Sequence, residues 1–595
     1  MKILNKIIPV FLGVAVGLVP LVIIPLFTDI HDFGKQIFLL LAGLILFVLW
    51  TIKSFSDKKI VFPKSKYLLP ITAFFVSSLI STIINSPLKI ASSLATAGGV
   101  TIFLCLLFYI YIQGLTKLKT ILLFLLGSGL VLAIINLILT SGILKLPINL
   151  PFWNLSITNS FSPLGNLISQ AVFLAVLAPI GFAVSYHYLQ EKKLGLAVAA
   201  FAANIIILAS VGMSVSLLAG SAKPIILSFS VAWSIAVEGL KTAKSALWGV
   251  GPGRFSAAFV SLRPISFNAS PYWNLRFGSA VWFLQILSEV GIVGLLAYIA
   301  LIWQIAKSGV KLIRESKPSP LALAMIFSLA FLIIVQFYIP FNFSLIFLFF
   351  CLVGLFDMAV KQKEESVEMD LAPLGPAAYV FLIFPVIFWG AVLYFAGKTS
   401  LASVDFLNSL KAAANNDGTQ TYNLQIKAIQ TDPWSPAYRI GYSQTNFALA
   451  NSLAAKKDLT ESDRNTVSQL VQQSLREARA AVSLDPSNIG SWENLANLYR
   501  NLINFAQDAD QWTVATYQEA IKLDPLNPQL RLDLGGVYFG QKNYNQAALF
   551  FNQATQLKPD LANAHYNLAS ALREANALVD AKREYEITQS LIKVD

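Results

Sequence analysis

The fold of this chain of 595 residues is decided by the stretch 219–306, where residues 249–255 read GVGPGRF and residues 283–296 read FLQILSEVGIVGLL. The first part, to about residue 277, is polar and basic in an otherwise apolar sequence. The second part begins polar and becomes an apolar run long enough to cross a bilayer. We therefore expect membrane helices before this stretch, and further membrane helices followed by a soluble arm after it.

Composition places the chain among polytopic membrane proteins. Hydrophobic residues make up 56% of it and charged residues only 13%, whereas soluble domains are about a quarter charged. The net charge of +12 is explained by lysines in short loops between membrane spans, so nucleic-acid binding is not predicted. Cys105 and Cys351 lie in apolar runs and the histidines are scattered. Neither a disulfide framework nor a metal site is expected, and no cofactor is predicted.

Apolar runs predict the number of membrane spans. A bilayer core of roughly 30 Å requires about 20 apolar residues in a helix. Lysines and arginines gather after the even-numbered runs, which predicts a cytoplasmic N-terminus and places the loop 219–279 and the C-terminal arm outside the cytoplasm. The expected location is the cytoplasmic (inner) membrane. Eleven runs are present, at about 7–28, 35–53, 67–86, 96–114, 119–143, 166–188, 193–218, 280–306, 320–339, 341–360 and 377–396.

From about residue 402 the composition becomes that of a soluble helical domain with internal repeats. Residues 484–486, 523–525 and 557–559 read LDP, LDP and LKP, and an insertion around 504–511 lengthens one unit. Such units must stack to bury their apolar faces. They usually bind peptides or proteins, although a role as a spacer or in dimerisation is also open. The last full unit has the 34-residue tetratricopeptide pattern, with Leu534, Gly535, Tyr538, Ala547, Phe551, Ala554 and Pro559.

The predicted fold class is all-α, a polytopic membrane domain of about eleven spans followed by a tetratricopeptide-repeat solenoid. The expected domains are N-terminal transmembrane helices (1–218), an extracytoplasmic loop with the candidate site (219–279), C-terminal transmembrane helices (280–397) and an extracytoplasmic repeat domain (398–595).

The loop 219–277 carries an excess of positive charge on the side where the positive-inside rule expects little. Two explanations are open: the loop binds something anionic, or it is long enough to escape the rule. The glycine-rich turn 249–253 could present its N–H groups to an anion. Arginines with interleaved aromatic side chains suit phosphate and sugar, and would also suit lipid headgroups at the membrane interface. The charged residues are Lys223, Lys241, Lys244, Arg254, Arg263 and Arg276, against Glu238.

Trp233 and Ala236, the turn GVGPGRF and the run from Leu284 to Leu296 occur in the order seen in one family. This pattern resembles the O-antigen ligase and polymerase superfamily, which also shares the number of spans and the large late loop. The resemblance implies inverting, metal-independent glycosyl transfer. A glycan on undecaprenyl diphosphate would pass to an acceptor at the outer face of the cytoplasmic membrane. Loop arginines would hold the diphosphate, and a histidine would deprotonate the acceptor hydroxyl.

The sequence departs from the family at two positions. The usual His-Asn pair corresponds to about Ala280 and Val281, and the usual arginine before the tryptophan corresponds to Phe229. Either Glu289, with Glu238 as a second acid, supplies the base, or the protein lacks the chemistry and is a membrane scaffold for envelope assembly. A plain alternative for Glu289 is a helix-end residue that pairs with a loop arginine.

The candidate residues are therefore assigned as follows. Glu289 and Arg276 are the candidate catalytic residues. The expected partners are a lipid-linked glycan donor, an unidentified acceptor, membrane lipids, and a protein or peptide bound by the repeats. The candidate substrate-binding residues are Arg254, Arg263, Gly251, Gly253, Trp233, Asn268, Trp273 and Gln285.

Overall fold

The computed structural model describes residues 4–150, 155–220, 222–315, 318–360, 366–371, 373 and 380–592. Over these ranges the chain forms 24 α-helices and a few short strands, which confirms the predicted all-α class. The chain packs as two units. The first, the membrane unit, contains 1–229, 240–253 and 279–404, and the second, the repeat unit, contains 230–239, 254–278 and 405–595. The loop 219–279 thus contributes residues to both units.

The membrane unit contains the apolar helices. By length and composition, eight described helices could span a membrane (α2, α3, α6, α7, α8, α12, α14 and α15), and three shorter apolar helices (α1, α5 and α13) occupy the other predicted runs. The helices of this unit are α1 (Leu4–Leu18), α2 (Asp32–Asp57), α3 (Leu68–Asn85), α4 (Lys89–Leu94), α5 (Gly99–Leu115), α6 (Leu118–Thr140), α7 (Leu167–Gln190), α8 (Leu194–Ala219), α10 (Ala243–Trp248), α12 (Trp282–Glu315), α13 (Pro320–Val335), α14 (Phe343–Val360) and α15 (Val380–Ala414), the last with its residues to 404.

Helix α14 lies at the core of the membrane unit. Every residue of α14 from Phe343 to Asp357 is buried, because α5, α12 and α13 pack around it. A helix that is apolar all round is expected in such a position. Helix α12 packs against α3, and this pair carries the candidate site described below.

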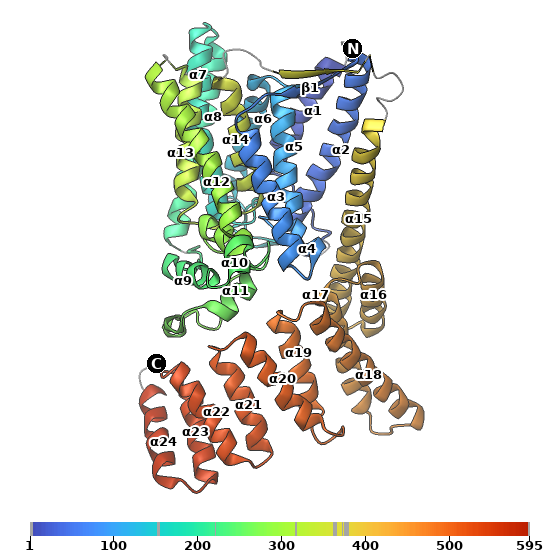
Figure 1. The fold of residues 1–595 in the computed structure, drawn as a ribbon. Coiled ribbons are helices and arrows are strands. Elements are labelled where there is room, and N and C mark those ends of the chain that lie inside the picture. Colours follow the sequence, from blue (N-terminus) through green and yellow to red (C-terminus); the bar gives the residue numbers. More distant parts are fainter. Residues whose placement is uncertain are drawn as a thin grey trace. The chain divides into compact units, whose positions relative to one another are not determined.

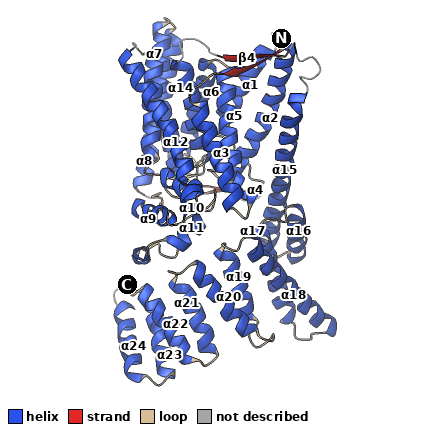
Figure 2. Ribbon diagram, in the orientation of Figure 1, coloured by secondary structure: helices blue, strands red, loops and turns tan. Residues whose placement is uncertain are grey.

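Two short antiparallel strand pairs, which the sequence does not predict, join loops of the membrane unit. Strand β1 (Lys59–Pro63) pairs antiparallel with β4 (Ser366–Asp370), at the end of the helices where the N-terminus lies (Figures 1 and 2). Strand β2 (Ile148–Leu150) pairs with β3 (Leu155–Ile157). Strands of 3 to 5 residues carry too little alternation to be recognised from sequence.

The repeat unit is a row of helix pairs, which confirms the tetratricopeptide prediction. Gly535 allows the close approach that the pattern implies, because a Cβ there would lie 2.6 Å from the Phe551 ring. Asn488, Asn527 and Asn543 cap three of the helices with their side chains. The helices are α16 (Gly418–Thr431), α17 (Pro436–Ala454), α18 (Glu461–Leu484), α19 (Ile489–Asn501), α20 (Ala509–Leu523), α21 (Pro528–Gly540), α22 (Tyr544–Leu557), α23 (Ala562–Glu574) and α24 (Leu578–Ile592).

Loop segments complete the repeat unit. Helix α9 spans Phe229–Gly239, α11 spans Phe255–Leu262, and a 3-10 helix covers Ile265–Ala269. The rings of Phe259, Phe267 and Phe277 lie 5.2 to 6.1 Å apart between centroids and form a small aromatic core within the loop. Edge-to-face ring contacts of this kind hold a short segment in one shape.

Candidate functional site

Helix α12 is broken in the middle of its apolar sequence, at Gly291. Gly291 has φ 79° and ψ −173°, a conformation that side chains rarely permit. The carbonyl groups just before the break need partners from outside the helix. The glycine-rich turn supplies them: the N–H of Val250 donates to Ser288 O (2.9 Å), and the N–H of Gly251 donates to Glu289 O (3.0 Å).

The turn and the break touch through their backbones. A Cβ on Gly249 would lie 2.3 Å from the carbonyl carbon of Glu289, and one on Gly291 would lie 2.4 Å from the carbonyl oxygen of Leu247. Gly249 itself has φ 68° and ψ −162°. Glycine is therefore required on both sides of the contact, for conformation and for space. The N–H groups of the turn could serve an anion by sequence alone, and in the structure two of them, those of Val250 and Gly251, donate to α12.

Helix α3 supports the same junction with polar side chains near its C-terminal end. The Ser81 hydroxyl lies 2.6 Å from Trp248 O and 2.8 Å from Glu289 O. The Asn85 amide donates to Gly249 O at 2.9 Å. Gly253 packs closely as well, because a Cβ there would lie 2.7 Å from the Ala95 methyl. These contacts satisfy backbone groups that a break inside a membrane helix would otherwise leave exposed to hydrocarbon.

The side chains of Gln285 and Glu289 lie on one face of α12, as their spacing predicts. Glu289 is fully buried and Gln285 is 3% exposed. The Gln285 amide donates to Glu289 Oε1 at 3.2 Å and lies 3.4 Å from Thr96 Oγ1. Ala280 and Val281, which stand where the resembling family has His-Asn, are buried just before the start of the same helix. Within the membrane unit the structure thus brings together Gly251, Gln285 and Glu289.

The loop arginines belong to the repeat unit and bind its carboxylates. Arg263 donates to Asp524 at 2.8 Å, and this pair is almost completely buried, with side chains 3% and 0% exposed. Arg254 contacts Asp485 at 3.3 Å and also the Ser487 hydroxyl.

Arg276 makes a second kind of contact, at the surface. It donates two hydrogen bonds to the two oxygens of Glu493, and its side chain is 33% exposed. It also lies 3.6 Å from Asp524. Two parallel bonds between a guanidinium and a carboxylate give the pair a fixed orientation.

Asn268 and Trp273 contact Lys558, the central residue of the LKP triplet. The Asn268 side chain donates to Leu526 O (2.8 Å) and Leu557 O (3.1 Å), and the Lys558 ammonium donates to Asn268 O (2.9 Å). The same ammonium lies 5.3 Å from the centre of the Trp273 ring, a cation–π contact. Trp233 lies apart from these pairs on α9, and 52% of it is exposed.

The repeat triplets therefore act as partners that the sequence analysis missed. Asp485, Asp524 and Lys558 are the middle residues of the triplets LDP, LDP and LKP, and each contacts the loop. The recurrence of the triplets in the sequence identified the repeats. It did not indicate that the loop contacts the turns in which these triplets lie. The three arginines of the loop thus have carboxylates of their own chain as partners in this unit.

Burial shifts the pKa values of the basic and the acidic partner in opposite directions. Burial lowers the pKa of Arg263 and raises the pKa of Asp524, although each attracts the other's charged form. Burial likewise lowers the pKa of Arg254 more than Asp485 raises it. The pKa of Arg276 is instead raised, first by its hydrogen bond to Glu493. Because burying charges is costly, the Arg263–Asp524 pair fixes the position of the loop rather than adding much stability.

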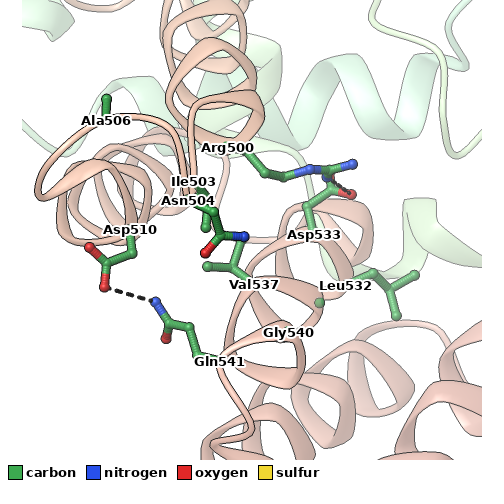
Figure 3. Close-up of a pocket in the computed structure, with 11 residues that line it drawn as sticks. Arg500, Ile503, Asn504, Ala506, Asp510, Leu532, Asp533, Val537, Gly540 and Gln541 are labelled. Carbon is green, nitrogen blue, oxygen red and sulfur yellow. Dashed lines mark hydrogen bonds and ion pairs between the residues drawn. The ribbon is translucent and has the colours of Figure 1, made fainter.

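A groove opens in the repeats, between α19, the segment that joins α19 to α20, and α21 (Figure 3). Its volume is about 620 Å³. In the described part of the chain, no group of three or more His, Cys, Asp or Glu side chains is arranged to hold a metal ion.

Comparisons with known proteins reach only part of the chain. No family model matches. A human protein, Protein O-mannosyl-transferase TMTC3, is 29% identical over 76 residues, which are 13% of this chain and 8% of that protein.

Solved structures of similar shape match about a third of the chain. The MamA protein has a TM-score of 0.27 with 15% identity, over 33% of this chain and 93% of MamA. YrrB, a TPR protein with an unusual peptide-binding site, has a TM-score of 0.24 with 13% identity over 32% of this chain and 86% of YrrB. TTC0263, a thermophilic TPR protein of Thermus thermophilus, has a TM-score of 0.23 with 18% identity over 33% of this chain and 93% of its own.

Proposed function

We propose that this multi-pass membrane protein is a glycosyltransferase similar to O-antigen ligases and polymerases. It transfers a glycan from undecaprenyl diphosphate to an acceptor at the outer face of the cytoplasmic membrane. The observation that carries the proposal is the buried carboxylate of Glu289 beside Gln285, at a break in a helix that could span the membrane. An ionisable group at membrane depth is costly, so its presence favours a function.

In the proposed reaction Glu289 is the general base. Its carboxylate accepts the proton of the acceptor hydroxyl, and that oxygen forms a bond to the anomeric carbon of the donor sugar. The bond from this carbon to the diphosphate oxygen breaks, and the diphosphate leaves with the electron pair, so the anomeric configuration inverts. The Gln285 amide, 3.2 Å from Oε1, orients the carboxylate.

The arginines take different parts in this proposal. Arg276 is the proposed stabiliser of the leaving diphosphate, because a third of its side chain is exposed, more than for Arg254 or Arg263. Arg254 is a further candidate, whereas Arg263 is a positioning residue that fixes the loop through Asp524. Trp273, in contact with Lys558, would present a sugar contact from the same segment, whereas the buried Asn268 would act as a positioning residue that holds this segment to the repeats. Trp233, exposed on α9, remains a candidate for stacking on a sugar ring.

The decisive experiment is transfer of a labelled glycan from its lipid carrier by purified Glu289→Gln protein. We expect transfer to fall at least about a hundredfold, as is usual when a general base is removed. Asp357→Asn is the matched control, because Asp357 is another buried carboxylate of the membrane unit and accepts a hydrogen bond from Tyr109 at 2.9 Å. Transfer at the wild-type rate by Glu289→Gln, with correct folding, would refute the proposal.

A second candidate function is a non-catalytic membrane scaffold whose repeats assemble envelope proteins. It is favoured by one observation: Arg254, Arg263 and Arg276 all pair with carboxylates of the repeats. On this reading the repeats, located outside the cytoplasm, bind a protein or peptide. Full cellular function with Glu289→Gln, together with loss of function on deletion of 405–595, would favour the scaffold over the enzyme.

A further inference from the structure

The groove of Figure 3 exists because one repeat departs from the 34-residue period. Helix α19 ends at Asn501 and α20 begins at Ala509, whereas α21 ends at Gly540 and α22 begins at Tyr544. The longer connection turns back at Asn504 (φ 70°) and Asp508 (φ 57°). It supplies Asn504, Ala506 and, at the start of α20, Asp510 to one wall of the groove.

Part of the floor of the groove is a strip of α21 without side chains. Gly536 and Gly540 are four residues apart on α21, and a Cβ at either position would have no atom within 4 Å. The neighbouring Gly535 is explained by packing, because its Cβ would lie 2.6 Å from Phe551. Packing does not explain the glycine at position 536, and glycine destabilises the interior of a helix relative to alanine. Its absence of a side chain keeps the floor open for close approach by a ligand backbone.

The lining is polar, with a net negative charge. Arg500 lies 3.6 Å from Asp533, and the Gln541 amide lies 3.5 Å from Asp510. Figure 3 shows Asn504 and Val537 between these two pairs. The lining residues therefore contribute two carboxylates, Asp510 and Asp533, and one guanidinium, Arg500.

The segment that forms one wall of the groove carries an exposed aromatic side chain. Phe505 stands between the lining residues Asn504 and Ala506, and 87% of it is exposed. The face of a phenyl ring attracts a cation. The amide side chains of Asn504 and Gln541 can each donate to and accept from a peptide backbone.

We propose that this groove binds an extended segment of a partner protein and takes a lysine or arginine side chain of that segment. The cation lies near Asp510 and Asp533, and the peptide backbone crosses the bare strip of α21 at Gly536 and Gly540. This proposal gives a site and a chemistry to the partner role suggested above for the repeats. It does not depend on glycosyl transfer.

The test uses the full chain in detergent and decapeptide libraries with one fixed central residue, lysine, arginine, glutamate or norleucine. We expect the lysine and arginine libraries to be retained about tenfold more than the other two, a difference typical of a specific charge contact. Asp510→Asn and Asp533→Asn should each reduce this preference. Equal retention of all four libraries, or a preference for glutamate, would overturn the proposal.

Larger side chains at position 536 test whether peptide binding requires the bare strip of α21. Gly536→Leu should abolish retention of the lysine library, whereas Gln546→Leu, an exposed position on α22 outside the groove, should not. Gly536→Ala separates loss of the site from loss of folding. Alanine stabilises a helix relative to glycine, and its methyl group would have no atom within 4 Å at this position. It should raise the melting temperature and still weaken retention. If Gly536→Leu retains the lysine library as well as the wild type does, peptides do not bind in this groove. That result would not bear on the proposed transfer reaction.

Discussion

Arg263 and Asp524 lie 261 positions apart in the sequence and form an ion pair that is almost completely buried, with 2.8 Å between Nη2 and Oδ1. Asp524 belongs to a repeat triplet and Arg263 to the loop. The triplets before and after it also contact the loop: Asp485 pairs with the Arg254 guanidinium, and the Lys558 ammonium donates to the backbone carbonyl of Asn268. The segment 254–278 is therefore bound along three successive corners of the solenoid.

Asp524→Ala should destabilise the repeat unit strongly. It leaves the buried Arg263 guanidinium without its carboxylate, which costs about 3–5 kcal/mol. The double change Arg263→Met with Asp524→Leu should cost much less, because neither charge is then buried. Denaturant unfolding followed by tryptophan fluorescence would measure both. Glu493→Gln, which disrupts a partly exposed pair, should cost only about 1 kcal/mol. Equal effects of Asp524→Ala and Glu493→Gln would contradict the assignment.

Alanine at Gly249 or Gly291 should disrupt the junction between the turn and α12. Each glycine has a backbone conformation that costs other residues about 1–3 kcal/mol, and the added methyl group would also collide with backbone. We expect a lower melting temperature for the detergent-solubilised protein. Gly212→Ala on α8, where a Cβ meets nothing within 4 Å, is the control and should be neutral or stabilising. If all three variants melt alike, the contact is not structural.

The stability difference between Asp533→Asn and the wild type should depend on pH. Burial raises the pKa of Asp533 in the folded protein, more than Gln529 and Arg500 lower it, and Glu493 adds to the increase. The folded state then binds the proton more tightly than the unfolded state, so the wild type gains stability as the pH falls through the raised pKa. The gain is complete below the ordinary value of 3.8.

Because asparagine does not titrate, the advantage of Asp533→Asn in melting temperature should be largest at neutral pH and should shrink in acid. The other acids titrate in both proteins and cancel in the difference. An advantage that grows in acid would mean that the carboxylate is stabilised as an anion. Melting curves at about four pH values between neutrality and about pH 3.5 suffice to decide this.

The orientation of the chain is a further prediction. Lysine-rich loops follow the even-numbered spans, so the connection at Lys192 should be cytoplasmic and the end of α15 extracytoplasmic. Alkaline phosphatase fused after Ala414 should be active, and the same enzyme fused after Lys192 should be inactive. The opposite result would place the loop 219–279 in the cytoplasm and remove the proposed donor from its reach.

Periodicity and apolar length made much of the fold predictable. The eleven apolar runs correspond to eight long helices and three shorter ones, since the length of a membrane helix is a property of local sequence. Gly535 and Phe551 were likewise expected to pack, because the repeat pattern specifies contacts within one unit. Spacing alone also placed Gln285 and Glu289 on one helix face.

Local sequence did not predict which residues form hydrogen bonds and ion pairs with the candidate residues. Nothing local to Arg263 distinguishes it from Arg276, although one is buried and the other is a third exposed. The difference arises from where the loop meets the repeat corners, which come much later in the chain. The sequence by itself determined the helices, the repeats and the residues that carry charge, because these follow from local composition and period. Only the tertiary structure decided that Gly251 pairs with the backbone of Glu289 and that the arginines pair with the repeats, because such contacts depend on chain segments that are distant in sequence.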